Sequence, residues 1–341
     1  MKTVDPLARA YRRRTPPPIK DYAALATEAT ALMRSESFAF RPADRRGLPG
    51  ALVRLVKDIP TVVVPDLHAR RDFLMALFEL PLEGGQRLKD ALDSGELQVL
   101  CLGDGFHAES RALERWQEAY QEYLGDWREH AAMNHEMTES MGLMEMVMHA
   151  KLRWPERFHF LKGNHENVKN ESENGNFPFR KFVEEGDMVR SWVERFYGPD
   201  FLERYAQMEL SLPLFAVGGR FLASHAEPAR PYTEDEIINA RLVPETVRGL
   251  TWTDNNRAEP GTVPALLARF LPEVDRPVYL SGHRTISGYY RERSDGAHLQ
   301  IHNPSKRIVA WVMPDRDVNP AVDIGEIRGP VPDGTRSRGS D

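Results

Sequence analysis

The sequence predicts a layered α/β fold, with buried strands at the centre and helices outside. The first observation is that five short apolar runs are typical of strands buried on both faces. The second is that longer stretches between the runs have apolar residues at helical spacing. Each run also ends in polar side chains that can bind metal, and layered α/β folds build sites at that edge of a sheet. The runs are residues 61–64, 99–102, 158–161, 221–223 and 278–280.

The composition excludes several classes of protein. The chain has 341 residues, with 45 Lys and Arg against 51 Asp and Glu, and its net charge is −6. This charge argues against non-specific nucleic-acid binding, and no apolar run approaches the ~18 residues of a membrane helix. The single cysteine, Cys101, excludes a disulfide framework and a Cys-rich zinc module. We therefore expect a globular cytoplasmic protein that contacts no membrane and no nucleic acid.

The two ends of the chain are expected to differ from its body. Arginines at 12–14 and prolines at 16–18 predict that residues 1–20 form an extended, solvated arm. Residues 326–341 are rich in Gly, Pro, Asp, Arg and Ser and are predicted to be disordered. We expect residues 21–325 to form one domain between these ends.

Three helical regions are predicted from the spacing of apolar residues. The first covers residues 21–35, and the third lies around residues 178–206. The second begins near residue 113 and contains a stripe of methionines, whose spacing favours core packing over an adaptable binding face. The stripe consists of Met137, Met141, Met144 and Met148.

The polar residues that follow the five strands form a consistent set of metal ligands. They offer carboxylate, amide and imidazole groups without a thiolate, a set that suits Mn, Fe or Zn and disfavours Ca. Six ligands are too many for one open catalytic zinc, but they suffice for two ions bridged by a carboxylate. The candidates are Asp66, His68, Asp104, Asn164, His225 and His283.

The order and context of these residues resemble the calcineurin-like metallophosphoesterases, especially the phosphoprotein phosphatase-like branch. The family's Gly-Asn-His-Glu block is intact at residues 163–166. The other blocks correspond to Pro65-Asp66-Leu67-His68-Ala69, Gly103-Asp104, Ser224-His225 and Gly282-His283. The resemblance covers roughly residues 60–313 and implies a core of two packed sheets, a β-sandwich, flanked by helices.

The resemblance implies a role for each residue. Asp66 and His68 would hold one of two divalent or trivalent metal ions, Mn, Fe or Zn. Asp104 would bridge both ions, and the second would be completed by Asn164, His225 and His283. A hydroxide shared by the ions would attack phosphorus in line, because two cations lower its pKa. His165 would protonate the leaving oxygen as general acid.

The second block departs from the family pattern. The Asp that orients the acidic histidine aligns with His107, the phosphate-clamping Arg aligns with Ala108, and the last Gly aligns with Glu109. The loss of the Asp removes an anion that would raise the pKa of His165, and the loss of the Arg removes a bidentate phosphate contact. The candidates to replace these groups in the substrate site are Glu109, Arg111, Arg257 and Arg284.

An insertion accompanies this departure, over residues ~109–138, where the family has only a short link. We expect a helical hairpin that forms a cap or wall beside the metal site. The favoured function is hydrolysis of a phosphomonoester, on a phosphoprotein or a small molecule. Two alternatives stay open, namely a nucleotide or diester hydrolase, such as a dinucleoside polyphosphate hydrolase, and a catalytically weak metal-binding scaffold. The sequence leaves the oligomeric state open.

Overall fold

The structure is a computed structural model that describes residues 5–328. The greater part of the predicted tail, residues 329–341, lies outside the described residues. In chain order the helices and strands are α1 (Pro6–Tyr11), α2 (Ile19–Arg34), β1 (Leu52–Arg54), β2 (Thr61–Val64), α3 (Arg71–Phe78), α4 (Leu88–Ser94), β3 (Gln98–Cys101), α5 (Leu113–Leu124), α6 (Ala131–Arg153), β4 (Phe158–Phe160), α7 (Glu185–Phe196), α8 (Pro199–Ser211), β5 (Phe215–Val217), β6 (Phe221–Ser224), α9 (Glu234–Ile238), α10 (Pro244–Thr251), α11 (Thr262–Phe270), β7 (Val278–Ser281), β8 (Arg291–Arg293), β9 (His298–Gln300), β10 (Ile308–Val312), α12 (Pro320–Asp323) and β11 (Ile324–Glu326).

Two mixed sheets form the centre of the molecule. The five-stranded sheet has the order β11-β10-β2-β3-β4, in which β2, β3 and β4 are parallel. The six-stranded sheet has the order β1-β5-β6-β7-β9-β8, in which β6, β7 and β9 are parallel. Parallel neighbours end at the same edge of a sheet, so the polar residues that follow them are brought close together.

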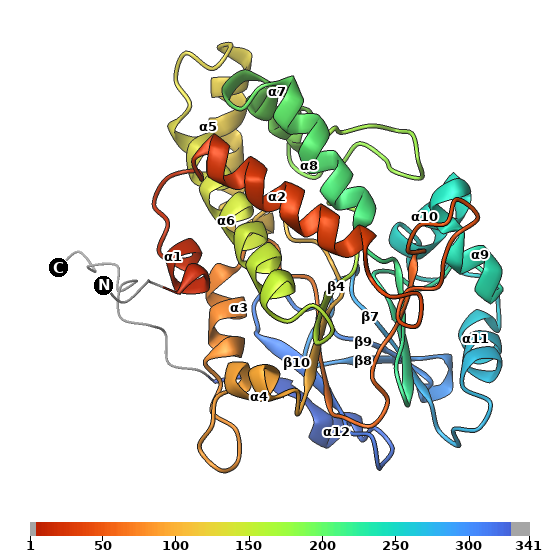
Figure 1. Ribbon diagram of the computed structural model, residues 1–341. Helices are drawn as coiled ribbons and strands as arrows, with labels where there is room; N and C mark the ends of the chain where they lie inside the picture. The colour runs from red at the N-terminus through yellow and green to blue at the C-terminus, as the bar shows by residue number, and fades with distance from the viewer. Residues whose placement is uncertain (1–4, 329–341) are drawn as a thin grey trace.

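Strand residues alternate between two cores because successive side chains point to opposite faces. Val63 and Leu100 lie in a cluster between the two sheets, together with Phe221 and Leu280. Val62, Val64 and their neighbours on that sheet belong instead to a core formed with helices α1 to α8, and the far face of the second sheet packs against α9, α10 and α11. Figure 1 shows the sheets between α3 and α4 on one side and α9 and α11 on the other. The predicted layered α/β fold with a two-sheet core is confirmed.

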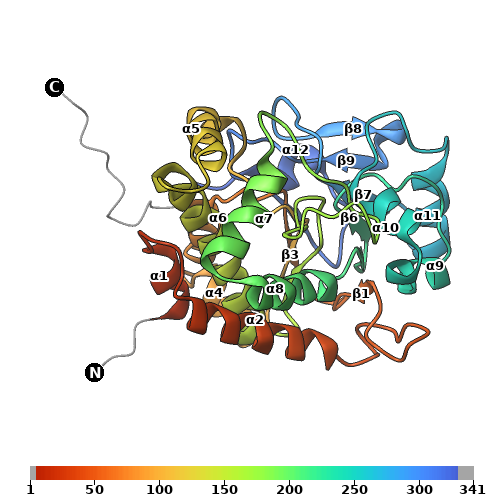
Figure 2. The ribbon, with the colours of Figure 1, turned by 90° about the horizontal axis from the view of Figure 1, so that it is seen from above.

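All five predicted strands are present, as β2, β3, β4, β6 and β7. The predicted helix at 21–35 corresponds to α2, which lies beside α8 when the molecule is seen from above (Figure 2). The helical region at 178–206 is divided into α7 and α8 at Gly198, which has a φ of 87° and precedes the N1 proline of α8. No helix within residues 5–328 is both long and apolar enough to cross a membrane.

The expected extended arm is wrong for residues 6–11, which form α1. Asp5 accepts a hydrogen bond from Leu7 N at the start of this helix, and Pro6 occupies its first position, where a missing N–H has no cost. Leu7 and Ala10 are buried against the body of the molecule. Arg13 is not solvated either, because it forms an ion pair with Glu145 of α6. The basic and proline-rich composition of residues 12–18 concealed this helix.

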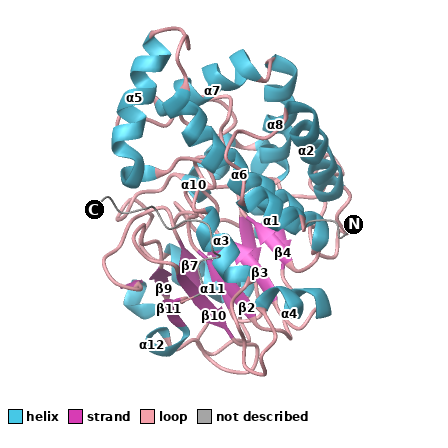
Figure 3. Cartoon of the chain, turned by 90° about the vertical axis from the view of Figure 1, so that its left-hand side faces the viewer, coloured by secondary structure: helices cyan, strands magenta, loops and turns pink. Residues whose placement is uncertain are grey.

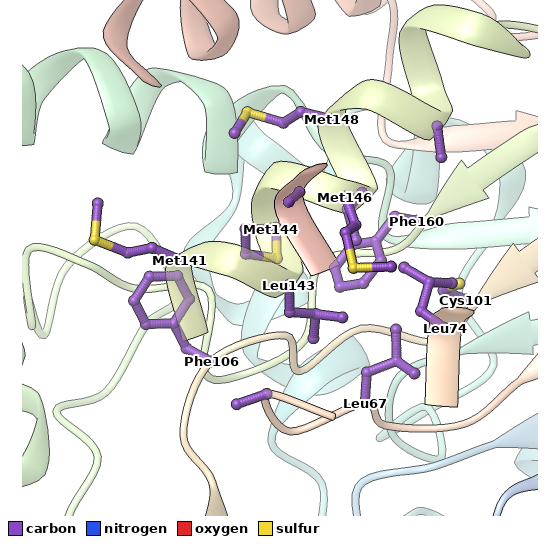
Figure 4. Close-up of a cluster of buried hydrophobic side chains, with 14 of the residues drawn as sticks. Leu67, Leu74, Cys101, Phe106, Met141, Leu143, Met144, Met146, Met148 and Phe160 are labelled. Atoms are coloured by element: carbon purple, nitrogen blue, oxygen red, sulfur yellow. The ribbon is translucent and has the colours of Figure 1, made fainter. Parts of the chain in front are cut away.

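The predicted second helical region is divided into α5 and α6, which pack against each other. Helix α5 lies on the side of the molecule away from α12 (Figure 3), whereas the C-terminal end of α6 reaches α4, where Arg153 donates to Asp93 at 3.0 Å. The four residues of the methionine stripe are buried, so the interpretation as core packing is confirmed. Figure 4 shows Met141 and Met144 of α6 beside Phe106, which lies in the altered second block. A Cβ on Gly105 would lie 2.2 Å from the sulfur of Met144, so α6 packs directly on the loop that follows β3.

Candidate metal centre

The strand ends bring seven predicted site residues into one buried centre. The loop after β2 contributes Asp66 and His68, and the loop after β3 contributes Asp104. The loops after β6 and β7 contribute His225 and His283, respectively. The loop after β4 contributes Asn164 and His165. All seven lie within contact distances that link both sheets, and the side chain of His165 is 12% exposed. The seven residues named from the sequence are therefore neighbours in space.

The candidate ligand atoms face one another at distances suited to a shared cation. Nε2 of His68 lies 3.9 Å from Oδ2 of Asp66 and 3.7 Å from Oδ2 of Asp104. Nε2 of His225 lies 3.3 Å from Oδ2 of Asp104. Oδ1 of Asn164 lies 2.9 Å from Nε2 of His225 and 2.8 Å from Nδ1 of His283. Asp104 thus lies between the two halves of the ligand set.

Backbone contacts fix the orientation of two of the histidines. Nδ1 of His68 lies 3.0 Å from the carbonyl oxygen of His107, and Nδ1 of His225 lies 2.9 Å from that of Leu102. A carbonyl accepts only from an N–H, so in each ring Nδ1 is protonated and Nε2 is left free. The free Nε2 atoms both point toward Asp104, as metal-binding imidazoles do.

The backbone of the centre is strained at its predicted ligands. His68, Asp104 and His283 have φ values of 41°, 51° and 60°, in the left-handed region that non-glycine residues rarely adopt. Such strain costs about 1–3 kcal/mol per residue and is typical of functional sites. Two glycines allow the close approach of the loops, because a Cβ on Gly163 would lie 2.2 Å from Oδ1 of Asp104, and one on Gly282 would lie 1.8 Å from Oδ1 of Asp66.

Glu166 holds two of the strand-end loops together. Its buried carboxylate accepts hydrogen bonds from the backbone N–H groups of Asp104 at 3.0 Å, Gly105 at 2.7 Å and Gly163 at 2.6 Å. The Asp104 carboxylate in turn accepts from the N–H of His165 at 2.9 Å. The last residue of the intact Gly-Asn-His-Glu block therefore positions the predicted bridging carboxylate.

The electrostatics of the centre favour bound cations. Burial, together with the charges of Asp104 and Glu109, raises the pKa of Asp66 well above its usual value. Burial also raises the pKa of Asp104 to about 7 and lowers that of His225 to about 4. A bound cation stabilises buried carboxylates and neutral imidazoles of this kind, because its attraction to them offsets the cost of removing them from water.

Unsatisfied polar atoms provide a test of whether a metal fits this centre. Oδ1 of Asp66 and Nε2 of His283 are buried and have no hydrogen-bond partner among the described residues. Buried polar atoms are nearly always paired, so each orphan requires an explanation. Each of these atoms belongs to a predicted ligand, and three groups of acidic and histidine side chains here have ligand atoms within 4.8 Å of one another. The residues present therefore fit metal ions.

His165, the predicted general acid, lies among aromatic rings, and within residues 5–328 no carboxylate is paired with its Nδ1. Its Nδ1 is buried without a hydrogen-bond partner in the described part of the chain. The ring lies 4.7 Å from that of Phe179, 5.1 Å from that of His107 and 5.2 Å from that of His68, measured between centroids. Burial, then the neighbouring His107, lowers its pKa well below the usual value. His107 itself lies 3.5 Å from the Glu185 carboxylate and stacks on Trp116 of α5.

The four residues predicted to replace the missing phosphate and acid contacts lie in different surroundings. Glu109 contacts His68 and is paired with Lys181. Arg111 donates to the carbonyl oxygen of His68 at 3.2 Å and to Glu139 at 2.9 Å. Arg284 is paired with Asp254, whose carbonyl accepts from the backbone N–H of Arg257 at 3.1 Å. Of the three arginines, only Arg111 donates a hydrogen bond to a predicted ligand residue within the described part of the chain.

Sequence reasoning missed His302 altogether. This residue follows β9, the parallel neighbour of β7, and its ring is buried 5.3 Å from that of His68. Nδ1 of His302 lies 3.7 Å from Oδ2 of Asp66. The alternation His298-Leu299-Gln300-Ile301 before it was a usable signal for a short strand, but no continuous apolar run marked it.

Comparison with known proteins identifies the family. The model of the calcineurin-like phosphoesterase family matches residues 59–312. The chain belongs to the calcineurin-like phosphoesterases. Membership makes it a phosphoric ester hydrolase of the metal-dependent kind, and this agrees with the Asp and His clusters of the centre.

Two solved structures of phosphatases are similar to this chain. A protein serine/threonine phosphatase from Saccharomyces cerevisiae has a TM-score of 0.56 and 17% identity, over 87% of this chain and 84% of that one. A cold-active protein-tyrosine phosphatase from a psychrophilic Shewanella has a TM-score of 0.48 and 15% identity, over 77% of each chain. Among curated proteins, no sequence is significantly similar to this one. The likeness to the yeast enzyme is a likeness of fold.

Proposed function

We propose that this chain hydrolyses phosphomonoesters with two metal ions, Mn, Fe or Zn, at the strand-end centre. Asp66 and His68 would hold one ion, Asp104 would contact both, and the second would be held by Asn164, His225 and His283. The observation that supports this most is the set of Asp and His side chains whose ligand atoms lie within 4.8 Å of one another in three groups, two of which contain Asp104. When bound, two such ions supply Lewis-acid stabilisation of the phosphoryl charge and a nucleophile at neutral pH.

The chain's own residues would position and protonate the substrate. His165 is proposed as the general acid, which donates a ring proton to the leaving oxygen. Its lowered pKa leaves the ring neutral before substrate binds. A phosphate dianion placed against it would favour the protonated ring, because an opposite charge within a few ångströms raises the pKa of an imidazole. In other members of the family an Asp provides the anion beside this histidine. In this chain, where His107 replaces that Asp, the substrate phosphate would provide it.

Arg111 is the best placed of the predicted arginines to contact the phosphate. Its guanidinium is held beside the loop of His68, and its side chain is 38% exposed, so it can reach both the centre and solvent. Lys181, paired with Glu109 at 3.0 Å and 45% exposed, adds a second cation close by. Two cations suit the dianion of a monoester better than the single charge of a diester.

Rates on matched model substrates test the proposal. With Mn²⁺, Fe²⁺, Zn²⁺ or Co²⁺ added, p-nitrophenyl phosphate is expected to be hydrolysed at least about tenfold faster than bis-p-nitrophenyl phosphate. Asp104→Asn is the control, since an amide removes the charge that both ions would share, and it is expected to reduce the rate by a factor on the order of 100 or more.

Each alternative has its own outcome in this assay. A faster rate on the diester would favour the nucleotide or diester hydrolase. Bound metal with no turnover on either substrate, for the wild-type protein as for Asp104→Asn, would favour the catalytically weak scaffold. Either result would contradict the proposal of a phosphomonoesterase.

A further inference from the structure

We propose that His302 is an additional metal ligand and that Glu109, at the start of the insertion, holds it in place. The inference deepens the proposed function and rests on it, because it concerns the ion that Asp66 and His68 would hold.

The position of His302 is the first argument. One ligand atom each from Asp66, His68 and His302 lie within 4.8 Å of one another, and all three side chains are buried. Ligand atoms that bind one ion at ~2.1 Å are separated from one another by about 3–4 Å. The 3.7 Å between Nδ1 of His302 and Oδ2 of Asp66, and the 3.9 Å between Nε2 of His68 and the same oxygen, fall in this range.

The unsatisfied ring of His302 is the second argument. Nδ1 and Nε2 are both buried and both lack a hydrogen-bond partner within residues 5–328. Buried polar groups are nearly always paired, so a ring with two such atoms is expected to have a further partner. His298, four residues earlier on β9 and equally buried, differs because its Nε2 is paired with the Ser281 hydroxyl at 2.8 Å.

Glu109 identifies which nitrogen of His302 is the ligand. Its Oε2 lies 3.6 Å from Nε2 of His302, while Nδ1 of that ring faces Asp66. A metal-binding histidine usually directs its other N–H to a carboxylate, which fixes the tautomer and the ring orientation. The geometry therefore assigns Nδ1 as the ligand atom and Nε2–H as the group that Glu109 orients.

Glu109 is itself held firmly in this place. Its side chain is 7% exposed, its other oxygen lies 3.5 Å from Nε2 of His68, and Lys181 pairs with it at 3.0 Å. Its φ of 52° is strained, as at the predicted ligands. Glu109 stands where the family block has its last glycine, so the change in this block adds a carboxylate beside the ion. The departure from the family pattern would then strengthen one metal position.

Titration of the metal-free protein with Mn²⁺, followed by calorimetry, tests the assignment independently of activity. The wild-type protein is expected to bind two ions. His302→Ala is expected to weaken one of the two by at least about 100-fold, and Glu109→Gln, which keeps the volume, by about 10–100-fold. His298→Ala removes a buried histidine from the same strand and is expected to leave both affinities unchanged.

Two outcomes would overturn the assignment. If His302→Ala bound both ions as the wild type does, His302 would not be a ligand. If His298→Ala weakened the same ion equally, the effect would come from the strand and not from the ring. Circular dichroism monitors folding, and if His302→Ala does not fold, His302→Gln and Glu109→Gln carry the same test. If the wild-type protein bound no metal, the proposed function would be contradicted as well. If it bound two ions but His302→Ala changed neither affinity, only the assignment of His302 would fail.

Discussion

Gly282 shows how tightly single residues control the centre. A Cβ at this position would lie 1.8 Å from Oδ1 of Asp66, whose Oδ2 accepts from the N–H of His283 at 2.9 Å. Gly282→Ala would force the carboxylate aside, so metal affinity is expected to fall by at least about tenfold, as when a group that orients a ligand is lost. Overpacking would also cost about 1–3 kcal/mol of unfolding free energy. Calorimetric titration with Mn²⁺ and chemical denaturation measure the two effects.

Gly325 of β11 provides the matched control. A Cβ there would meet no atom within 4 Å, so Gly325→Ala adds the same methyl group in open space. Its metal affinity is expected to equal that of the wild type. Equal affinities for both variants would show that the Asp66 carboxylate does not depend on the space that Gly282 leaves.

The sequence was informative for residues that directly follow a continuous apolar strand. Asp66, Asp104 and His225 are such residues, and the structure brings them together. His302 follows a strand of only three residues, and Glu109 became a neighbour of His68 only through a turn with positive φ. Strands this short show no clear period, and contacts across a turn leave no trace in spacing.

An ion pair just after the N-terminal helix α1 adds to the packing that attaches this helix to α6. Nη2 of Arg13 donates to Glu145 at 2.7 Å, a second donation runs from Nε, and the carboxylate is 4% exposed. Arg13→Ala leaves this carboxylate buried and unpaired, so we expect the free energy of unfolding to fall by about 2 kcal/mol. Urea denaturation of the purified protein measures the change.

Arg12 and Glu145 supply the controls for this prediction. Arg12→Ala changes an exposed neighbour and is expected to stay within about 0.5 kcal/mol of the wild type. In the double variant, Arg13→Ala with Glu145→Ala, part of the loss should be recovered, because no buried charge remains unpaired. Additive losses of the two single variants would show that the pair contributes nothing as a pair.

Whole elements were predictable where their pattern was long or continuous. The methionine stripe of α6 extends over several turns, and β2 is a run of four apolar residues. Helix α1 has only six residues, and β1, β8, β9 and β11 are three-residue strands that include polar side chains, so neither a period nor a continuous apolar run shows in them. The tertiary contacts of these short elements, and not their propensities, keep them in place.

At the scale of the whole molecule, the centre exists only when both sheets are in place. Asp66, Asp104 and Asn164 come from the sheet that contains β2, β3 and β4, whereas His225 and His283 come from the sheet that contains β6 and β7. Pairings such as β6 with β7 join residues more than fifty positions apart. Spacing along the chain does not encode such pairings, so the family resemblance, and not periodicity, predicted the two-sheet arrangement.

Two metal ions are proposed to share Asp104 at this centre. Anomalous diffraction from crystals grown with Mn²⁺ tests it most directly. We expect two peaks, both beside Asp104, one near Asp66, His68 and His302 and the other near Asn164, His225 and His283. The absence of peaks, a single peak, or peaks distant from Asp104 would contradict it.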